Sequence, residues 1–286
     1  MAVIWKGAPV AAALSEALAA RCQALRQAGV TPTLALVRVG QRPDDISYET
    51  GAMKRCDKVG ISVRQFLLPE NCSREELLET IQEVNADPGI HGCLLFRPLP
   101  RREDEEEVCA LLAPEKDVDG MTAGSLASVF TGKGPGFPPC TAQACLEILD
   151  HYGVCLEGKR AVVIGRSLVI GRPVAMMLQA KNATVTMCHT KTADLPAVCR
   201  EADVLIAAAG KAGVVDARFV RPGQLVLDVG IHVGPNGKLC GDVQFDAVEP
   251  VVEAITPVPA GVGAVTTAVL AKHVVEAAQR AAGTKD

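Results

Sequence analysis

Short apolar runs alternate with amphipathic helical stretches along this chain of 286 residues, and that rhythm constrains the fold more than any other feature. The runs TLALVRV, IHGCLLF and AVVIG are apolar almost throughout, which is typical of strands buried on both faces. Helical stretches lie between them, and SREELLETIQEV opens with Ser73 and Glu76 in capping-box spacing. The pattern predicts an α/β fold with a mostly parallel sheet that helices cover on both faces.

The chain is longer than one typical domain, and its composition shifts near the middle. Glycine and proline concentrate in TGKGPGFPPC, residues 131–140, which indicates a boundary or a surface loop. Thr141 then reads as the N-cap of a connecting helix. We expect two domains with a cleft between them: an N-terminal α/β catalytic domain of residues 1–140 joined by a C-terminal helix, 262–286, and a Rossmann-like domain of residues 141–261.

Charge and cysteine usage exclude several classes of function. With 29 basic and 33 acidic residues, no excess of positive charge favours nucleic acid or an anionic membrane, and no apolar run approaches the roughly 18 residues of a spanning helix. The acidic run RREDEEE reads as a solvated helix start. The 11 cysteines show no C-x-x-C spacing, so we expect buried thiols in a cytoplasmic protein, no metal, and a small-molecule partner.

The segment AVVIGRSLVIGRP carries the clearest chemistry. An apolar strand runs into a loop with Gly165 and Gly171, followed by Pro173 in what would be the first turn of a helix. Backbone N–H groups at such a helix start can bind a phosphate, because glycines permit close approach and the helix dipole favours negative charge. The spacing is not G-x-G-x-x-G, and a purely structural turn is the alternative interpretation.

The next predicted strand bears on which dinucleotide would bind. In dinucleotide folds a carboxylate about 20 residues beyond the glycine loop accepts the ribose 2′-hydroxyl. Here the strand ends in TMCHTKT with His189, Thr190 and Lys191, and this stretch holds no carboxylate. The sequence therefore favours NADP, with NAD possible, and an ordinary strand-end loop remains the alternative.

The stretch SYETGAMKRC places Tyr48 and Lys54 on a predicted helix. A helix turns by about 100° per residue, so six residues place the lysine about 120° away from the tyrosine. Four residues would leave two side chains stacked, and that position holds Ala52.

Taken together, the motifs PEKDVDG, PPCTAQA, GRSLVIGRP, CHTKT, DVGI, GDV and TPVPAGVGAVT stand in an order that resembles the bifunctional methylenetetrahydrofolate dehydrogenase/methenyltetrahydrofolate cyclohydrolase family. The resemblance covers nearly the whole chain. It implies a homodimeric enzyme of one-carbon metabolism that oxidises methylenetetrahydrofolate, a reduced folate, to methenyltetrahydrofolate with NADP.

The resemblance also assigns site residues. Tyr48 would contact the ring system of the substrate and Asp119 would hydrogen-bond the pterin, and both are the candidate catalytic residues. Without the resemblance, Tyr48 would read as a core aromatic and Asp119 as a turn former. Further folate-binding candidates are Pro259 and Gly261, and the cofactor-binding candidates are Gly165, Arg166, Ser167, Thr190 and Ile231.

Two departures from the family pattern concern catalysis. The family has a lysine four residues after the tyrosine and a glutamine in VQLPLP, where this chain has Ala52 and Phe96. Lys54 and Arg97 should point elsewhere, by helix and strand periodicity. Because proton transfer needs positioned polar groups more than hydride transfer does, we expect the dehydrogenase to persist and the cyclohydrolase to be weak or lost. A non-catalytic folate- or nucleotide-binding homologue, or an enzyme retuned to another substrate, is the alternative.

Overall fold

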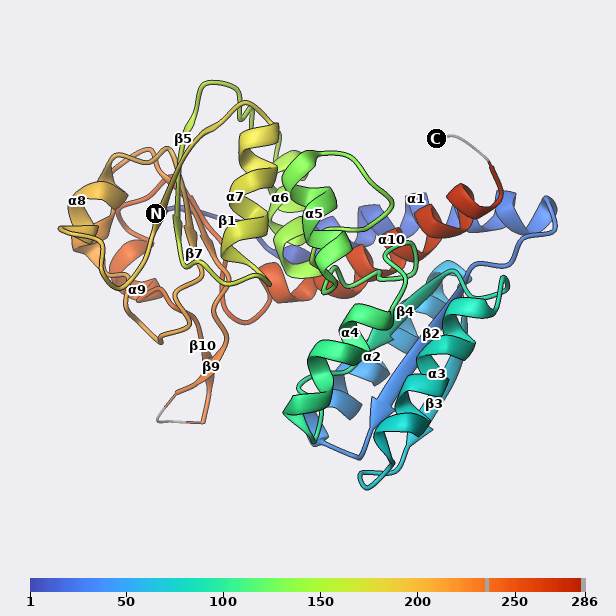
Figure 1. Cartoon of the computed structure of the whole chain (residues 1–286). Coiled ribbons are helices and arrows are strands. Elements are labelled where there is room, and N and C mark those ends of the chain that lie inside the picture. Colours follow the sequence, from blue (N-terminus) through green and yellow to red (C-terminus); the bar gives the residue numbers. More distant parts are fainter. Residues whose placement is uncertain (235–236, 284–286) are drawn as a thin grey trace. The chain divides into compact units, whose positions relative to one another are not determined.

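The computed structural model describes residues 1–234 and 237–283, and the chain forms two compact units (Figure 1). The six-stranded unit consists of residues 1–12 and 141–266. The three-stranded unit consists of residues 13–140 and the chain from residue 267 onward. The first strand of the chain thus belongs with the second half of the sequence, and the C-terminal helix belongs with the first half.

The three-stranded unit is built on a parallel sheet with the strand order β3-β2-β4. Its strands are β2 (Thr33–Val39), β3 (Ser62–Leu68) and β4 (Gly92–Leu95). Its helices are most of α1 (Gly7–Gln27), α2 (Pro43–Val59), α3 (Arg74–Ala86), the 3₁₀ turn η1 (Arg102–Asp104), α4 (Glu105–Leu111), α5 (Ala123–Thr131) and most of α10 (Thr266–Ala281).

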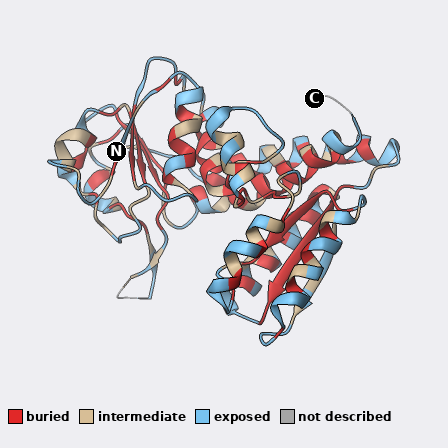
Figure 2. Ribbon diagram, in the orientation of Figure 1, coloured by how far each residue is buried: buried red, intermediate tan, exposed pale blue. Residues whose placement is uncertain are grey.

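Side chains along β2 point alternately to the two faces of the sheet, and helices pack on each face. All seven residues of β2 are buried, as the apolar run predicted (Figure 2). Ala35, Val37 and Val39 pack in one cluster with apolar residues of α3 and α4, whereas Arg38 contacts α2 on the opposite face. The predicted capping of α3 is confirmed, because the Ser73 hydroxyl accepts the backbone N–H of Glu76 at 3.0 Å.

The six-stranded unit is built on a sheet with the strand order β1-β11-β8-β7-β5-β6. Its strands are β1 (Val3–Ile4), β5 (Arg160–Ile164), β6 (Thr184–Cys188), β7 (Val204–Ala207), β8 (Leu225–Asp228) and β11 (Ala254–Ile255), and β9 (His232–Val233) and β10 (Leu239–Cys240) form a separate hairpin. Its helical elements are α6 (Cys140–His151), α7 (Gly171–Ala180), α8 (Leu195–Arg200), η2 (Ala217–Phe219), α9 (Phe245–Val248) and η3 (Val262–Ala264).

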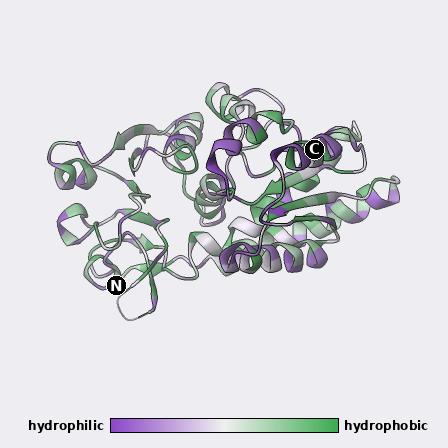
Figure 3. Ribbon diagram, turned by 60° about the horizontal axis from the view of Figure 1, so that its bottom comes forward, coloured by the Kyte–Doolittle hydropathy of each residue, from purple (hydrophilic) through white to green (hydrophobic). Residues whose placement is uncertain are grey.

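Every strand pair in the six-stranded sheet is parallel. Parallel strands need crossover connections, so the loops that follow their carboxyl ends gather at one edge of the sheet. The helices alternate hydrophobic and hydrophilic residues, as amphipathic crossovers should (Figure 3). Among the described residues, no helix is long and apolar enough to cross a membrane.

One local prediction was wrong, and a second held only in part. Helix α6 begins at Cys140, directly after two prolines, so Thr141 lies inside its first turn and is not the N-cap. The acidic run RREDEEE is not uniformly solvated either. Asp104 is buried and accepts the Arg101 guanidinium at 2.8 Å, and one carboxylate oxygen of Glu105 accepts the backbone N–H of Leu99 at 3.1 Å.

A buried polar network joins β2 to α2. The Arg38 Nε atom donates to the Glu49 carboxylate at 2.6 Å, and both residues are buried. Gln65 of β3 donates to the other oxygen of that carboxylate, and Arg38 also donates to the carbonyl of Gly40. Because Glu49 follows Tyr48 directly, this network fixes the segment of α2 that carries the tyrosine.

Removing one partner of this network should destabilise the protein strongly. Arg38→Met is expected to lower the free energy of unfolding by about 3–5 kcal/mol, because the Glu49 carboxylate stays buried without its cation. Adding Glu49→Leu removes that charge, so the double variant should regain most of the loss. Urea unfolding followed by circular dichroism measures both changes.

The matched control is Arg160→Met, which removes an arginine from the exposed Arg160–Glu201 pair. It should change the free energy of unfolding by less than about 1 kcal/mol. A similar small effect of Arg38→Met, or no recovery in the double variant, would contradict the stabilising role of the buried pair.

Candidate active site

The glycine loop after β5 forms as the sequence predicted. Gly165 has a φ of +125°, and a Cβ atom there would lie 2.1 Å from the carbonyl oxygen of Ala208. A Cβ atom on Gly171 would lie 2.3 Å from the carbonyl oxygen of Gly165. Both positions therefore require glycine, and the loop lies tightly against the end of β7 before α7 begins.

Ser167 has a local structural task in this loop. Its hydroxyl oxygen accepts the backbone N–H of Ile170 at 3.2 Å and that of Gly171 at 3.5 Å. The backbone N–H of Arg172 donates to the carbonyl of Ser167 at 3.0 Å. Ser167 thereby shapes the turn into α7, and the Arg166 side chain before it is exposed.

The end of β6 lies directly beside the end of β5. Ile164 and Cys188 are partners in the sheet register, so Arg166 and Thr190 each follow a paired strand end by two residues. Both are exposed. The structure thus places these two cofactor candidates at neighbouring strand ends on one edge, where a 2′-phosphate could contact a cation and a hydroxyl.

The remaining candidates of the six-stranded unit occupy the same edge. Ile231 follows β8 and is 58% exposed, and a Cβ atom on Gly263 would lie 3.2 Å from its Cδ1 atom. Pro259 is exposed and Gly261 is buried in the loop after β11. A Cβ atom on Gly261 would lie 2.4 Å from the carbonyl oxygen of Pro257, so this turn also requires glycine.

Sequence reasoning missed two buried carboxylates that support this edge. Asp228 accepts the backbone N–H groups of Asp242 at 2.9 Å and Val243 at 3.0 Å, and burial raises its pKa to about 7. Asp242 accepts the N–H groups of Gly210 and Lys211, each at 3.0 Å, and lies 2.7 Å from His232 Nε2. An aspartate at the end of an apolar strand run, as in LVLDVG, was the available signal.

In the three-stranded unit, Tyr48 of α2 contacts the ring of Phe96. Its ring packs edge-on against Phe96, with ring centroids 6.3 Å apart and an interplanar angle of 78°. Phe96 is 7% exposed, and Ala52, one turn beyond Tyr48 on α2, is 0% exposed. Lys54 is exposed on another face of α2, as its spacing predicted.

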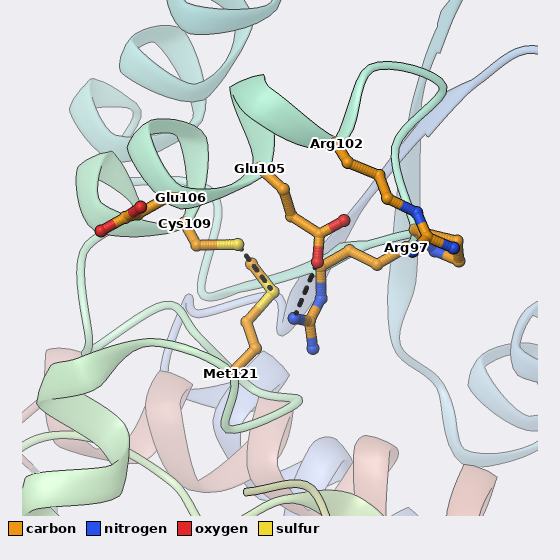
Figure 4. Close-up of a pocket in the computed structure, with 7 residues that line it drawn as sticks. Arg97, Arg102, Glu105, Glu106, Cys109 and Met121 are labelled. Atoms are coloured by element: carbon orange, nitrogen blue, oxygen red, sulfur yellow. Dashed lines mark hydrogen bonds and ion pairs between the residues drawn. The ribbon is translucent and has the colours of Figure 1, made fainter.

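Arg97 points into a surface pocket of about 550 Å³ within the three-stranded unit (Figure 4). Its guanidinium lies 3.5 Å from the Glu105 carboxylate, and Cys109 and Met121 line the same pocket. The Arg97 side chain is 26% exposed, so it is a half-buried charge at the pocket rim. Glu106 points away from Arg97 in Figure 4.

Asp119 lies in the tight turn that leads to Met121 and is only partly exposed. Burial raises the pKa of its carboxyl to about 6, a contact with the Cys140 thiol lowers it, and the negative charge of Asp117 adds to the increase. Arg97 is close enough to oppose that increase. Asp119 therefore titrates near neutrality and can act as either a hydrogen-bond acceptor or a proton carrier.

The two units carry different parts of the predicted site. Tyr48 and Asp119 belong to the three-stranded unit, whereas Pro259, Gly261 and the cofactor candidates belong to the six-stranded unit. A parallel sheet with a glycine loop, a helix start and exposed Arg166 at its carboxyl-terminal edge defines a Rossmann-type dinucleotide-binding protein.

Comparison with known proteins identifies the family. Residues 5–119 match the catalytic domain, and residues 139–282 the NAD(P)-binding domain, of the tetrahydrofolate dehydrogenase/cyclohydrolase family. The chain belongs to this family of bifunctional enzymes.

Curated relatives and solved structures agree with this assignment. The chain is 52% identical to the bifunctional protein FolD of Carboxydothermus hydrogenoformans and 51% identical to that of Clostridioides difficile, over 96% of each chain. The bifunctional FolD of Campylobacter jejuni has a TM-score of 0.94 at 37% identity, over 98% of this chain and 99% of that one. A Trypanosoma brucei FolD complexed with NADP and an inhibitor has a TM-score of 0.90 at 33% identity, over 98% of each chain.

Replacing Asp119 should stabilise the protein at high pH. The folded-state pKa of about 6 exceeds the ordinary value of 3.8, so ionisation costs folding free energy, and stability falls as pH rises from about 4 to about 6. Asp119→Asn removes that cost. At about 1.4 kcal/mol per pKa unit, the variant should gain up to about 3 kcal/mol at pH 8 and almost nothing at pH 4.

Thermal unfolding at the two pH values measures the difference. Asp44→Asn, at an exposed position of α2, controls for the loss of one negative charge. An equal gain at both pH values, or a loss at pH 8, would contradict the burial argument.

Proposed function

We propose that this protein oxidises methylenetetrahydrofolate to methenyltetrahydrofolate with NADP, and that its cyclohydrolase activity is weak or absent. Family membership supports the dehydrogenase. The proposal of weak or absent cyclohydrolase activity rests on the apolar wall beside Tyr48, made by Ala52 and Phe96. Neither side chain can polarise a carbon centre, hold a water or transfer a proton.

Hydrolysis of a methenyl bridge requires an activated water and a protonated leaving nitrogen. A positioned acid or base typically contributes ~10² to 10⁴ in rate. Among the described residues near Tyr48, Lys54 is exposed on another face of α2, and the Arg97 guanidinium pairs with Glu105 at the pocket rim. We therefore expect neither cation to replace a lysine at position 52.

Hydride transfer makes smaller demands on this chain. NADP supplies the hydride acceptor, so the protein must bind both reactants, orient them and exclude water. We assign pterin hydrogen bonding to Asp119, ring contact to Tyr48, and the lining of the folate cleft to Pro259 and Gly261. These positions do not depend on a polar group at residues 52 or 96.

We assign cofactor binding to Gly165, Arg166, Ser167, Thr190 and Ile231, in a domain of residues 141–261. Gly165 lets the backbone approach a phosphate closely, because a side chain there would collide with Ala208. Arg166 and Thr190 lie at neighbouring strand ends, which supports contact with the 2′-phosphate of NADP. Ile231 would cover the nicotinamide with its exposed side chain.

We propose that the protein is a cytoplasmic homodimer. Strand β3 is an edge strand of its sheet, none of its residues is buried, and Leu67 on it is 51% exposed. Unpaired strand edges are ready sites for pairing with a second chain. All 11 cysteines are free, which suits a reducing compartment.

An enzyme retuned to another reduced folate is the second candidate. Phe96 supports it, because its ring packs on Tyr48 and would form a new wall of the folate pocket. Turnover of methylenetetrahydrofolate by the purified protein favours the main proposal. Binding without turnover favours the retuned enzyme or a non-catalytic homologue.

Restoring the polar pair should create cyclohydrolase activity. The purified protein should reduce NADP with methylenetetrahydrofolate while hydrolysing methenyltetrahydrofolate slowly. Ala52→Lys combined with Phe96→Gln should raise the hydrolysis rate by about 10²-fold or more, because it supplies a cation and an amide beside Tyr48. Loss of absorbance of the methenyl compound measures that rate.

The control is Ala52→Met combined with Phe96→Leu, which changes side-chain size without adding polar groups. Thermal unfolding of both double variants checks that the buried substitutions are tolerated. Rapid hydrolysis by the unaltered protein would refute the proposal, as would equal activity of the two double variants.

Arg166 should determine the choice of dinucleotide. Arg166→Ser is expected to raise the KM for NADP by about 10-fold or more while leaving the KM for NAD nearly unchanged. Only NADP carries the ribose 2′-phosphate that the Arg166 guanidinium would bind. Initial rates at saturating methylenetetrahydrofolate provide both values. Lys159→Ser, at the exposed position directly before β5, is the control, and an equal loss for both dinucleotides would contradict the assignment.

A further inference from the structure

One buried carboxylate of the six-stranded unit receives hydrogen-bond donors from two different loops. Asp242 follows β10 and is 0% exposed. One of its carboxylate oxygens accepts the backbone N–H of Gly210 at 3.0 Å, and the other accepts that of Lys211 at 3.0 Å. The second oxygen also lies 2.7 Å from Nε2 of His232. Gly210 and Lys211 follow β7, whereas His232 lies in the chain after β8, so Asp242 connects the segments that follow two neighbouring strands.

The position of Asp242 is itself fixed from several sides. Its backbone N–H donates to the carboxylate of Asp228 at 2.9 Å, and its carbonyl accepts the N–H of Val215 at 3.0 Å. A Cβ atom on Gly230 would collide with the Asp242 carboxylate, so the chain after β8 passes directly beside it. The carboxylate is therefore held where both loops reach it.

The loop after β7 also supports the glycine loop after β5. The backbone N–H of Ala208 donates to the carbonyl of Ile164 at 2.8 Å, at the end of β5. The carbonyl oxygen of Ala208 fills the space that a Cβ atom on Gly165 would occupy. Gly210 follows Ala208 by two residues. By holding Gly210, Asp242 fixes the backbone against which the phosphate-binding candidate Gly165 rests.

His232 connects the same carboxylate to the nicotinamide candidate. A carboxylate oxygen accepts, so Nε2 of His232 carries the hydrogen of this pair and donates it. The residue directly before His232 is Ile231, which is 58% exposed. The His232 side chain is only 24% exposed, so water has limited access to the hydrogen bond that holds this segment.

A comparable polar residue lies at the opposite end of β8, away from the cofactor candidates. Gln224 is 0% exposed and directly precedes β8. Its side-chain nitrogen donates to the carbonyls of Cys199 and Ala202, each at 2.8 Å, and its side-chain oxygen accepts the N–H of Arg221 at 2.8 Å. Gln224 therefore resembles Asp242 in burial and in its number of partners, and it provides a matched control.

We propose that Asp242 is a positioning residue for the dinucleotide, because its carboxylate joins the loop after β7 to the chain after β8. This link fixes the phosphate-binding and nicotinamide-binding parts of the cofactor site relative to each other. A preorganised site loses less entropy on binding and brings the reacting atoms into a near-attack geometry. The proposal rests on the cofactor-binding roles proposed above for Gly165 and Ile231.

The first test is amide hydrogen exchange, followed by NMR in the full-length protein without ligand. Asp242→Ala should speed the exchange of the Gly210 and Lys211 amides by about 10-fold or more, because both lose their acceptor. His232→Leu should leave these two amides protected, since Asp242 still accepts them. Gln224→Ala should also leave them protected. Unchanged exchange of both amides in Asp242→Ala would overturn the role of the carboxylate.

The second test separates the two ends of the cofactor. Adenosine 2′,5′-bisphosphate carries the phosphates of the adenosine end of NADP and lacks the nicotinamide. Asp242→Ala should raise its Kd, measured by isothermal titration calorimetry, by about 10-fold, because the support of the glycine loop is lost. His232→Leu should leave that Kd unchanged and lower kcat/KM for NADP by about 10-fold, because only the segment of Ile231 is released. His232→Gln, which keeps an N–H donor, should retain most of kcat/KM.

The control distinguishes positioning from stability. Gln224→Ala should lower the melting temperature without changing either the Kd of the bisphosphate or kcat/KM for NADP. An equal rise of that Kd in Gln224→Ala and Asp242→Ala would show that Asp242 serves stability alone. An unchanged kcat/KM in His232→Leu, or an equal loss in His232→Gln, would also overturn the proposal. If Asp242→Ala fails to fold, the two His232 variants decide the question.

Failure of the proposed function has a different signature. It would appear as no reduction of NADP by the unaltered protein with methylenetetrahydrofolate. Hydrogen exchange at Gly210 and Lys211 and the binding of adenosine 2′,5′-bisphosphate require no turnover. These two measurements therefore decide the role of Asp242 whichever folate the enzyme uses.

Discussion

Parallel strand pairing is the constraint on which the rest of this structure depends. Each parallel pair in the six-stranded sheet requires a crossover, so the chain returns to the same edge after β5, β6, β7, β8 and β11. Residues far apart in sequence, such as Arg166 and Ile231, therefore share one edge without any direct bond between them. The strand pairs of the three-stranded sheet are also parallel, and Phe96 and Arg97 follow the carboxyl end of β4.

Burying a carboxylate near these edges lowers the stability of the fold unless its charge is compensated. The degree of compensation therefore indicates whether the group serves the fold or a ligand. Asp119 has a raised pKa because burial is only partly compensated by the Cys140 thiol and Arg97. Glu49 is more deeply buried, but Arg38 and Gln65 compensate its charge, and it serves to hold α2. A carboxylate left incompletely paired beside a turn suits a ligand better than it suits the fold.

Features set by local sequence were predictable. Strands β2, β4 and β5 followed from apolar runs, the cap of α3 from Ser73 and Glu76, and the loop after β5 from its glycines, because each depends on neighbours within a few residues. The division of the chain into units was less accessible, since α10 joins residues 13–140 through contacts such as that of His273 with Val118.

Features set by tertiary contact were not predictable. The pairing of Arg38 with Glu49 joins a strand to a helix, and that of His232 with Asp242 joins two sides of a hairpin. Neither helix nor strand periodicity in the sequence predicts either pair. The start of α6 was misplaced by two residues, because Thr141 is a good cap in isolation while the prolines before Cys140 set the actual boundary.

The distribution of charge around the folate candidates argues for a division of chemical labour. Arg97, Asp117, Asp119 and the Cys140 thiol form one electrostatic group: burial raises the pKa of the Asp119 carboxyl, the thiol lowers it, Asp117 raises it and Arg97 lowers it. Tyr48 instead packs against Phe96, with the methyl group of Ala52 buried one helical turn away. An ionisable side for recognition and an apolar side beside the tyrosine suit a reaction that moves a hydride, because hydride transfer favours a dry, ordered contact, whereas hydrolysis needs a held and activated water.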